Sequence, residues 1–596
     1  MADRQPRVLQ VNGPLVVAHL PGTPTGEQVR LGSLQLTGEI IAREGPRAVI
    51  QVYENTEALR PGDFVEPLGF PLSVELGPGL LGNIFDGVQR PLAQIRELHG
   101  DHVPRGLDVP ALDRNRSWHF TPCTAMEAGA RVTGGVPLGS VEETATITHH
   151  ILMPPGLEGE LVELAPEGDY KVTDAIGRLR SSDGEEHELT LLQRWPVRVA
   201  RPYLRRDHSI APLLTGQRVL DTFFPLLKGG KAAIPGPFGA GKTMLQQQVA
   251  RWAAADLVIY VGCGERGNEL VDILESFPEL TDPHTGRSLM ERTLLIANTS
   301  NMPVVAREAS IYVGVTIAEY YRDQGFDVVM VADSTSRWAE ALREVGGRLG
   351  EMPVEEGYPA YLASRLSAFY ERAGRVETLS NRPGSVTLIG AVSPPGGDFS
   401  EPVTSHTKEI VRCFWALSKD LADARHYPAI SWSESFSGYV GVAAGWWAEQ
   451  VNEKWEQRRA SALARLTQAD ELARIVNLVG PEALSPGQRW VLESARLVRE
   501  GILQQSAMDE VDSYASPEKQ YALLTLMDHI HKDGEKLIKQ GVPVQVLLEL
   551  PILARARRAK STYNSEQLEL LTEFIKEVRN EFEQIRREYE SVEEHA

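Results

Sequence analysis

The chain has 596 residues, of which 42% are hydrophobic and 24% charged, so it is too long for one core and has the composition of a soluble globular protein of about three to five domains. Its net charge of −20 opposes the phosphate contacts that dominate nucleic-acid binding, which disfavours a protein that tracks DNA or RNA. Three widely spaced cysteines, no apolar run long enough for a bilayer and no apolar segment behind the N-terminal charges predict reduced thiols and a cytoplasmic protein.

Residues 1–71 contain short alternating apolar runs between glycine and proline turns, such as Leu15–Ala18 and Ala48–Val52. Runs of this length and spacing predict a small N-terminal β-barrel. The next segment, from Gly77 to Leu92, is rich in glycine, which indicates special backbone geometry rather than chemistry.

Residues 117–187 return to a β pattern, and we interpret them as an inserted strand-rich module that interrupts a nucleotide domain made of residues 72–116 and 188–436. The module contains the pair His149 and His150, which invites a metal interpretation. Adjacent strand residues point to opposite faces, so the two rings do not easily share one ion and we disfavour a metal site there.

Residues 188–436 alternate short apolar runs with helical patterns, which predicts a mainly parallel sheet covered by helices on both faces. A helix is expected over 306–324, after Pro303 and before Gly325. Strands are expected over 232–235, 257–262, 293–297, 328–332 and 386–392.

Residues 437–596 have lost the strand pattern and predict a C-terminal helical domain. In its last segment, large apolar residues fall on one helical stripe with charges elsewhere, which is more typical of a core-facing helix than of a partner surface. The stripe consists of Leu568, Leu571, Phe574, Ile575, Val578, Phe582 and Ile585.

The strongest motif lies between the expected strand 232–235 and a helix expected over 243–254. It fits G-x-x-x-x-G-K-[ST], in which backbone N–H groups surround phosphate oxygens, the lysine reaches the terminal phosphates and the hydroxyl meets Mg²⁺. This context predicts a bound nucleoside triphosphate. The motif residues are Gly236, Pro237, Phe238, Gly239, Ala240, Gly241, Lys242 and Thr243.

Phosphoryl transfer also needs a carboxylate on the metal side and a group that orients water. Asp333 ends the expected strand 328–332 and is our candidate for the Mg²⁺ side; the alternative is a cap of the next helix. Glu265 follows the expected strand 257–262 and is our candidate for orienting water, with Glu269 as the alternative. Arg266 and Arg337 are candidates for phosphate contact or for structural ion pairs.

Together these motifs resemble the catalytic A subunit of V/A-type rotary ATPases. The resemblance rests on the phosphate loop, on the runs that begin at Gly262 and Asp333, on Gly77 to Leu92 and on Ser393 to Asp398. It covers essentially the whole chain, including the inserted module. Ala240 stands where eukaryotic relatives carry a cysteine, which indicates the prokaryotic type.

The resemblance implies a multidomain α/β fold with an N-terminal β-barrel, a central RecA-like P-loop domain, an inserted β-rich module and a C-terminal helical domain over 437–596. It implies ATP hydrolysis or synthesis with Mg²⁺, coupled to H⁺ or Na⁺ movement through a separate membrane sector. It also implies Glu265, Lys242 and Arg266 as catalytic residues, and Thr243 and Asp333 on the metal side, with Asp333 acting through water.

In this family an aromatic residue at the position of Tyr427 and another after an alanine pack on adenine. This chain has Ala507 and Met508 at the second place, and a thioether can still cover a ring. The expected partners are a non-catalytic B subunit in an A₃B₃ hexamer, which supplies an arginine in trans, and the central and peripheral stalks. No nucleic acid is expected, and the protein would meet the membrane on its cytoplasmic side only through other subunits.

Two other classes share such a phosphate loop: a non-catalytic nucleotide-binding subunit of the B type, and a secretion-type or RNA-translocating hexameric ATPase. The complete loop together with Glu265 argues against the first class. The acidic charge, the inserted module and the helical tail argue against the second.

Overall fold

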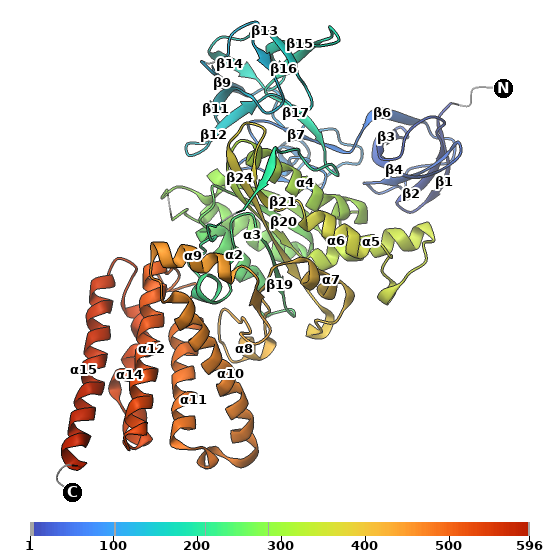
Figure 1. The fold of residues 1–596 in the computed structure, drawn as a ribbon. Helices are drawn as coiled ribbons and strands as arrows, with labels where there is room; N and C mark the ends of the chain where they lie inside the picture. Colours follow the sequence, from blue (N-terminus) through green and yellow to red (C-terminus); the bar gives the residue numbers. More distant parts are fainter. Residues whose placement is uncertain (1–4, 101–102, 125, 209, 284, 594–596) are drawn as a thin grey trace.

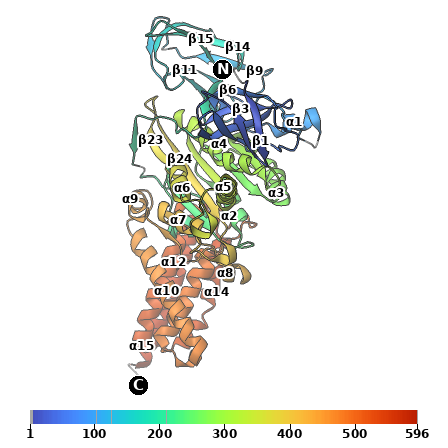
Figure 2. The ribbon, with the colours of Figure 1, turned by 90° about the vertical axis from the view of Figure 1, so that its right-hand side faces the viewer.

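The computed structural model describes residues 5–593 apart from 101–102, 125, 209 and 284. A central α/β body carries the N-terminal β-barrel and the inserted β-module at one end (Figure 1). The C-terminal helices form a bundle at the other end, and the view turned by 90° agrees (Figure 2). The fold class predicted from the sequence is confirmed.

The N-terminal sheet is antiparallel and closes into a barrel. Its strands have the neighbour order β1-β2-β5-β4-β3-β6. The N–H of Val8 donates to the carbonyl of Asp63 (2.8 Å) and that of Val65 to the carbonyl of Pro6 (3.2 Å), which joins the first strand to the last. The strands are β1 Arg7–Asn12, β2 Leu15–His19, β3 Glu27–Leu31, β4 Leu36–Glu44, β5 Arg47–Val52 and β6 Val65–Pro71.

The central sheet is mainly parallel and has the order β26-β25-β19-β24-β22-β20-β21-β8. Two strands extend beyond their predicted ends, because β20 continues through Glu265 and β24 begins at Pro383. Short β18 (Arg205–Asp207) and β23 (Gly374–Glu377) extend it beside β24. The main strands are β8 Ile84–Phe85, β19 Lys231–Pro235, β20 Leu257–Glu265, β21 Thr293–Thr299, β22 Asp327–Asp333, β24 Pro383–Val392, β25 Cys413–Phe414 and β26 Phe436–Ser437.

Helices cover both faces of this sheet, as predicted. Side chains of β20 alternate between two cores: Val258 and Tyr260 pack with α2 and α3, whereas Ile259 and Val261 pack with α4 and α5. The helices of this body are α1 Leu92–His99, α2 Lys242–Trp252, α3 Gly267–Glu279, α4 Val304–Asp323, α5 Thr335–Leu349, α6 Leu362–Tyr370, α7 Pro402–Ile410 and α8 Lys419–Asp423.

The inserted module consists of two four-stranded antiparallel sheets, with orders β10-β13-β15-β16 and β12-β11-β9-β14. The two-stranded pair β7 (Ser73–Leu76) and β17 (Gln193–Pro196) lies at its base. Its strands are β9 Ser117–Pro122, β10 Arg131–Val132, β11 Pro137–Glu142, β12 Thr148–Leu152, β13 Gly159–Leu164, β14 Gly168–Lys171, β15 Ala175–Ser181 and β16 Glu186–Thr190.

A buried polar cluster fixes this module to α4. One carboxylate oxygen of Glu143 accepts the three successive backbone N–H groups of residues 79–81, at 2.8, 2.9 and 3.0 Å. Its other oxygen lies 2.7 Å from Nδ1 of His149, whose Nε2 lies 2.8 Å from the hydroxyl of Tyr320. Both ring nitrogens of His149 are therefore engaged, while His150 stacks elsewhere, on Phe326.

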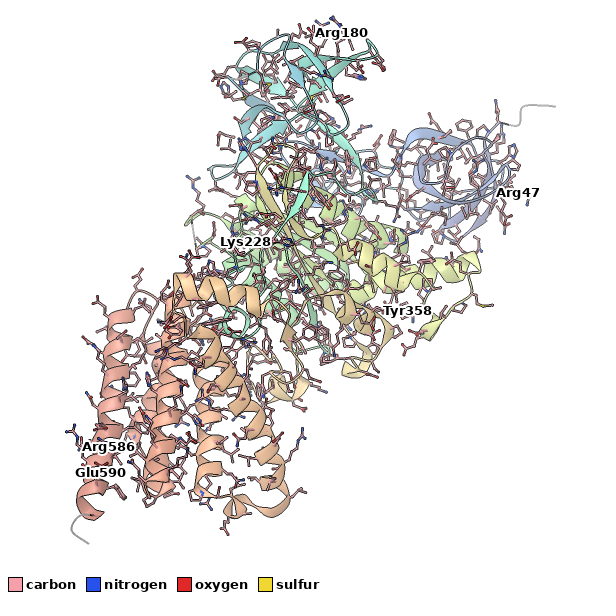
Figure 3. The ribbon with its side chains drawn as sticks, viewed as in Figure 1. Arg47, Arg180, Lys228, Tyr358, Arg586 and Glu590 are labelled. Carbon is pink, nitrogen blue, oxygen red and sulfur yellow. The ribbon has the colours of Figure 1, made fainter. Side chains whose placement is uncertain are left out.

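The C-terminal bundle shares its core with the α2 and α3 face of the sheet. The apolar stripe predicted on the last helix is buried, and Arg586 pairs with Glu590 (3.0 Å) on the same helix (Figure 3). None of the described helices is long and apolar enough to cross a bilayer. The bundle helices are α9 Val440–Gln450, α10 Trp455–Val479, α11 Pro486–Val498, α12 Pro517–Lys539, α13 Val544–Leu548, α14 Pro551–Thr562 and α15 Leu568–Glu593.

Candidate active site

The predicted phosphate loop joins the end of β19 to the start of α2. Gly241 precedes the helix with φ 89° and ψ 23°, a left-handed conformation that favours glycine. Lys242 is the first residue of α2, and its Nζ donates to the carbonyl oxygens of Gly236 (2.6 Å) and Pro237 (3.0 Å). The loop therefore directs the helix N-terminus and the lysine into the same space.

Lys242 lies in a partly desolvated position. Burial lowers its pKa, and the nearby carboxylates of Asp333 and Glu265 offset part of that effect. A phosphate oxygen is a stronger acceptor than the two carbonyls that the ammonium now contacts. The lysine is thus placed to transfer its hydrogen bonds to an anion.

A cavity of 810 Å³ lies in front of the loop. Its wall contains every charged residue that the sequence proposed for chemistry. Five carboxylates and three cations line it: Glu265, Glu269, Asp272, Asp333 and Glu340, with Lys242, Arg266 and Arg337. Thr243 also lines it, so the hydroxyl and the carboxylate proposed for the metal side share one cavity.

Glu265 is aimed by a β-bulge at the end of β20. Cys263 pairs with Asn298 and Glu265 with Thr299, so Gly264 is an extra residue in the strand. Gly264 has φ +70°, and a Cβ there would lie 2.7 Å from Cδ of Arg307. Only glycine fits this bulge without displacing its neighbours.

The buried carboxylates lack enough positive charge around them. Burial raises the pKa of Glu265 to about 9, and the charge of Asp333 and a hydrogen bond with Glu269 act in the same direction. Burial also raises the pKa of Asp333, although Tyr260 donates to its Oδ2 at 2.8 Å. A cluster of acids with raised pKa values fits a divalent cation, which would compensate their charge.

The two candidate arginines differ in their contacts. The guanidinium of Arg266 lies over the ring of Phe238, 4.8 Å from its centroid, at the cavity wall. Arg337 forms an ion pair with Glu340 at 2.9 Å, and this hydrogen bond is the main cause of its raised pKa. The structure thus brings both arginines to the cavity, one stacked on an aromatic ring and one paired with a carboxylate.

A second cavity of 630 Å³ adjoins the first, and Gly241 and Met244 line both. Tyr427, Ala507 and Met508 line the second cavity, which brings together the residues proposed to contact the base. The Met508 side chain is 82% exposed and Tyr427 is 44% exposed, so both present surface that a planar ligand can cover.

Sequence reasoning missed three residues that hold the site. Ser334 donates from its hydroxyl to Glu265, Tyr260 donates to Asp333, and Arg307 packs against the bulge at Gly264. Tyr260 lies in an apolar strand, where it looks like an ordinary core residue. Arg307 is in the first turn of α4, distant in sequence from the residues it supports. Only the position of Ser334, next to Asp333, was a usable signal.

Four family models match the chain. They are described as the ATP synthase alpha/beta family beta-barrel domain (residues 8–69), the ATPsynthase alpha/beta subunit barrel-sandwich domain (109–198), the ATP synthase alpha/beta family nucleotide-binding domain (216–437) and the C-terminal domain of V and A type ATP synthase (444–547). In order, they match the barrel, the inserted module, the central body and the helical bundle.

Named relatives match over nearly the full length. The chain is 69% identical to a V-type ATP synthase alpha chain from Nitrosococcus oceani, covering 98% of this chain and 99% of the relative. It is 55% identical to the A subunit of the A-type ATP synthase from Methanopyrus kandleri, covering 97% and 98%. Among solved structures, the assembled ATPase EscN of the enteropathogenic E. coli type III secretion system matches with TM-score 0.62 at 21% identity, covering 88% of this chain and 100% of that one, which supports the fold alone.

Proposed function

The chain belongs to the ATP synthase alpha/beta family, in its V/A-type branch, and from that premise we propose how its residues perform the reaction. It is the catalytic subunit of a V/A-type rotary ATPase, which hydrolyses or synthesises ATP coupled to H⁺ or Na⁺ transport across a membrane. The observation that carries the proposal for its site is that the phosphate loop and the acid cluster line one cavity. Its relatives set aside the B-type and secretion-type alternatives.

We propose the following division of the chain. Residues 1–71 form the barrel, 72–116 and 188–436 the nucleotide-binding domain, 117–187 the inserted module and 437–596 the helical domain. The strand and helix bounds support this division, because β6 ends at Pro71, β9 begins at Ser117 and the last strand ends at Ser437.

The phosphate loop would bind the triphosphate. The N–H groups at the start of α2 and the ammonium of Lys242 contact the β- and γ-phosphates, while Tyr427, Ala507 and Met508 hold the adenine in the adjoining cavity. Thr243 directly, and Asp333 through water, would hold Mg²⁺, which supplies positive charge next to the phosphate oxygens. The remaining loop residues shape the cradle around the substrate.

Glu265 would orient and polarise the water that attacks the γ-phosphorus. Its position at the tip of the bulge and its hydrogen bond from Ser334 fix the carboxylate at the cavity wall. In hydrolysis it takes a proton from the water as the bond to the leaving ADP oxygen breaks; synthesis reverses these transfers. Arg266 would contribute charge near the transferred phosphate from the opposite wall.

The protein is part of a multisubunit enzyme, as its relatives are ATP synthase chains. We propose that it alternates with a B-type non-catalytic subunit in an A₃B₃ ring that supplies an arginine in trans, around a central stalk and held by a peripheral stalk. The complex would lie on the cytoplasmic side of the cell membrane and meet the bilayer through other subunits.

The test is a matched pair of variants, Glu265→Gln and Glu269→Gln, in the assembled complex. We expect Glu265→Gln to retain Mg-ADP affinity and to lose about a hundredfold or more in kcat, because the amide can contact water but cannot take its proton. Glu269→Gln, which changes a carboxylate at the same wall, should lose much less. The opposite ranking of the two kcat values would move the water-orienting role to Glu269.

A further inference from the structure

One wall of the base cavity is a loop of the helical domain, residues 504–512, which we name the base loop. Most of its residues line the cavity, including Ala507 and Met508. The opposite wall belongs to α2 and to Tyr427 and Pro428 of the central body. The width of the base cavity therefore depends on how the base loop is held against that body.

Arg218 is the main hold between the two walls. It is fully buried, and its backbone N–H donates to Oε1 of Gln505 (2.8 Å). In its guanidinium group, Nε donates to the carbonyl of Ile502 (2.9 Å) and Nη2 to that of Gln504 (2.8 Å), while Nη1 lies 2.7 Å from Oδ1 of Asp512. All four contacts reach the base loop or the turn that leads into it.

The contact with Asp512 continues into the loop. Burial alone would raise the pKa of Asp512, but the charge and hydrogen bond of Arg218 outweigh it, so the pKa lies below its ordinary value. The ionised carboxylate accepts the backbone N–H of Ser506 through Oδ2 at 2.8 Å. Arg218 thus holds Asp512, and Asp512 holds the residue immediately before Ala507.

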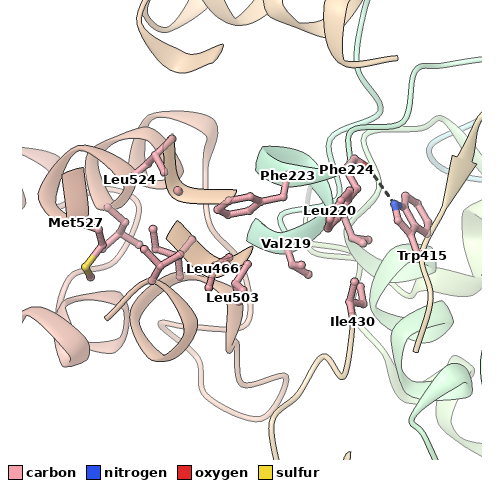
Figure 4. Packing of buried hydrophobic residues seen from close by; sticks show 14 of the residues in the cluster. Val219, Leu220, Phe223, Phe224, Trp415, Ile430, Leu466, Leu503, Leu524 and Met527 are labelled. Atoms are coloured by element: carbon pink, nitrogen blue, oxygen red, sulfur yellow. Dashed lines mark hydrogen bonds between the residues drawn. The ribbon is translucent and has the colours of Figure 1, made fainter. Parts of the chain in front are cut away.

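Arg218 is itself rigidly placed. It precedes the π-helical turn η1 (Val219–Phe223), whose apolar side chains belong to the core that joins the central body to the bundle. Figure 4 shows Val219, Leu220 and Phe223 facing Leu466, Leu503 and Leu524 of the bundle. An arginine anchored in such a junction transmits its own position to the groups it contacts.

We propose that Arg218 is a positioning residue for the nucleotide base: by fixing the base loop it sets the affinity for adenine without contributing to phosphate binding. The inference rests on the proposed function, because it takes the second cavity as the base site. Arg218 lines neither cavity, so it would act only through the loop.

The experiment compares two ligands on the full-length chain by calorimetry: Mg-ADP, which carries a base, and Mg-tripolyphosphate, which does not. In Arg218→Lys the charge remains but the two forked hydrogen bonds are lost, so we expect Mg-ADP to bind about tenfold to a hundredfold more weakly. Affinity for Mg-tripolyphosphate should change by less than about twofold, because the phosphate loop is untouched. Equal weakening of both ligands, or unchanged Mg-ADP affinity, overturns the proposal.

Arg459→Lys is the matched control. Arg459 also lies at this junction, and its Nε donates to the carbonyl of Phe223 (2.9 Å), but it is not among the residues that line the base cavity. It should leave the ratio of the two affinities unchanged, and a shift as large as that of Arg218→Lys would also overturn the proposal. Should Arg218→Lys fail to fold, Asp512→Asn offers the same comparison, with weakening confined to Mg-ADP as the expected result.

A further variant separates this proposal from the proposed function. Lys242→Ala should abolish binding of Mg-tripolyphosphate and weaken Mg-ADP strongly, because both ligands need the phosphate loop. Unchanged binding of both ligands in Lys242→Ala would overturn the proposed function. A ligand-selective loss in Arg218→Lys, by contrast, depends only on the base cavity.

Discussion

Burial decides the protonation of the residue on which the proposed chemistry depends. Glu265 is covered by protein and faces Asp333, so the protonated form is favoured in the folded chain. A general base must be ionised, which means that the positive charge brought by the metal and the partner is also needed to prepare this carboxylate. The same residue thus connects ligand binding with catalysis.

This has a measurable consequence for stability. Folding raises the pKa of Glu265 from its ordinary value of 4.5 to about 9, so the folded chain keeps a proton that the unfolded chain releases. Its contribution to the free energy of unfolding is fully present below about pH 4.5 and is lost as pH rises through about 9. We expect the Tm of the nucleotide-free wild type to fall, relative to that of Glu265→Gln, between these pH values.

Calorimetry of both proteins across this range, at constant ionic strength, measures the difference. The glutamine is neutral at every pH, so Glu265→Gln also serves as the internal control for the remaining groups. Two Tm curves that stay parallel across the range would show that Glu265 titrates in the folded chain as it does in the unfolded one.

At this scale, sequence reasoning identified the residues with a motif signature and missed those without one. Lys242, Thr243, Glu265 and Asp333 all line the cavity, because glycine turns and strand ends restrict where such residues can lie. Arg218 offered no such signal. Its importance comes from contacts more than 280 residues away, and no local pattern records a contact of that kind.

Among the elements, the end of β20 matters most for function. Its sequence, Gly262-Cys263-Gly264-Glu265, was interpreted as a turn after the strand, because two glycines weaken a strand pattern. In the structure the strand continues through a bulge, since Glu265 still pairs with Thr299 of β21. Regular alternation predicted the apolar strands and the burial of α15, whereas an irregular pairing depends on the neighbouring strand.

The bulge leads to a prediction for Gly264→Ala. A Cβ at Gly264 would lie 2.7 Å from Arg307 and 3.2 Å from Cβ of Arg337, on a backbone with φ +70°. The bulge must shift and turn Glu265 away, so we expect kcat to fall about tenfold or more, with a small change in Mg-ADP affinity.

The matched control is Gly267→Ala, three residues further on at the start of α3. A Cβ at Gly267 would contact nothing within 4 Å, so this variant should keep nearly the full kcat. Steady-state rates and calorimetric affinities of both variants in the assembled complex provide the measurement. A Gly264→Ala enzyme with the wild-type kcat would mean that the bulge does not aim Glu265.

For the whole molecule, charge explains why the chain would need a partner. The phosphate cavity is lined by five carboxylates and three cations, so it is net negative before the triphosphate enters. Two of those cations are already engaged, because Arg337 pairs with Glu340 and Arg266 lies over Phe238. Mg²⁺ would supply part of the missing charge, and the remainder must come from outside this chain.

We therefore expect the purified chain to bind Mg-ADP but to hydrolyse ATP about a thousandfold or more slowly than the complex with a B-type partner, the usual effect of an arginine supplied in trans. Binding survives because the phosphate loop and the base cavity belong to one chain, whereas the transition state needs the additional cation. Rates measured before and after adding the partner, with native mass measurement of the ring, test this expectation. Substituting the partner's arginine by lysine should return the ring to the rate of the isolated chain without dissociating it, and full turnover by the isolated chain would place all the required charge within this one polypeptide.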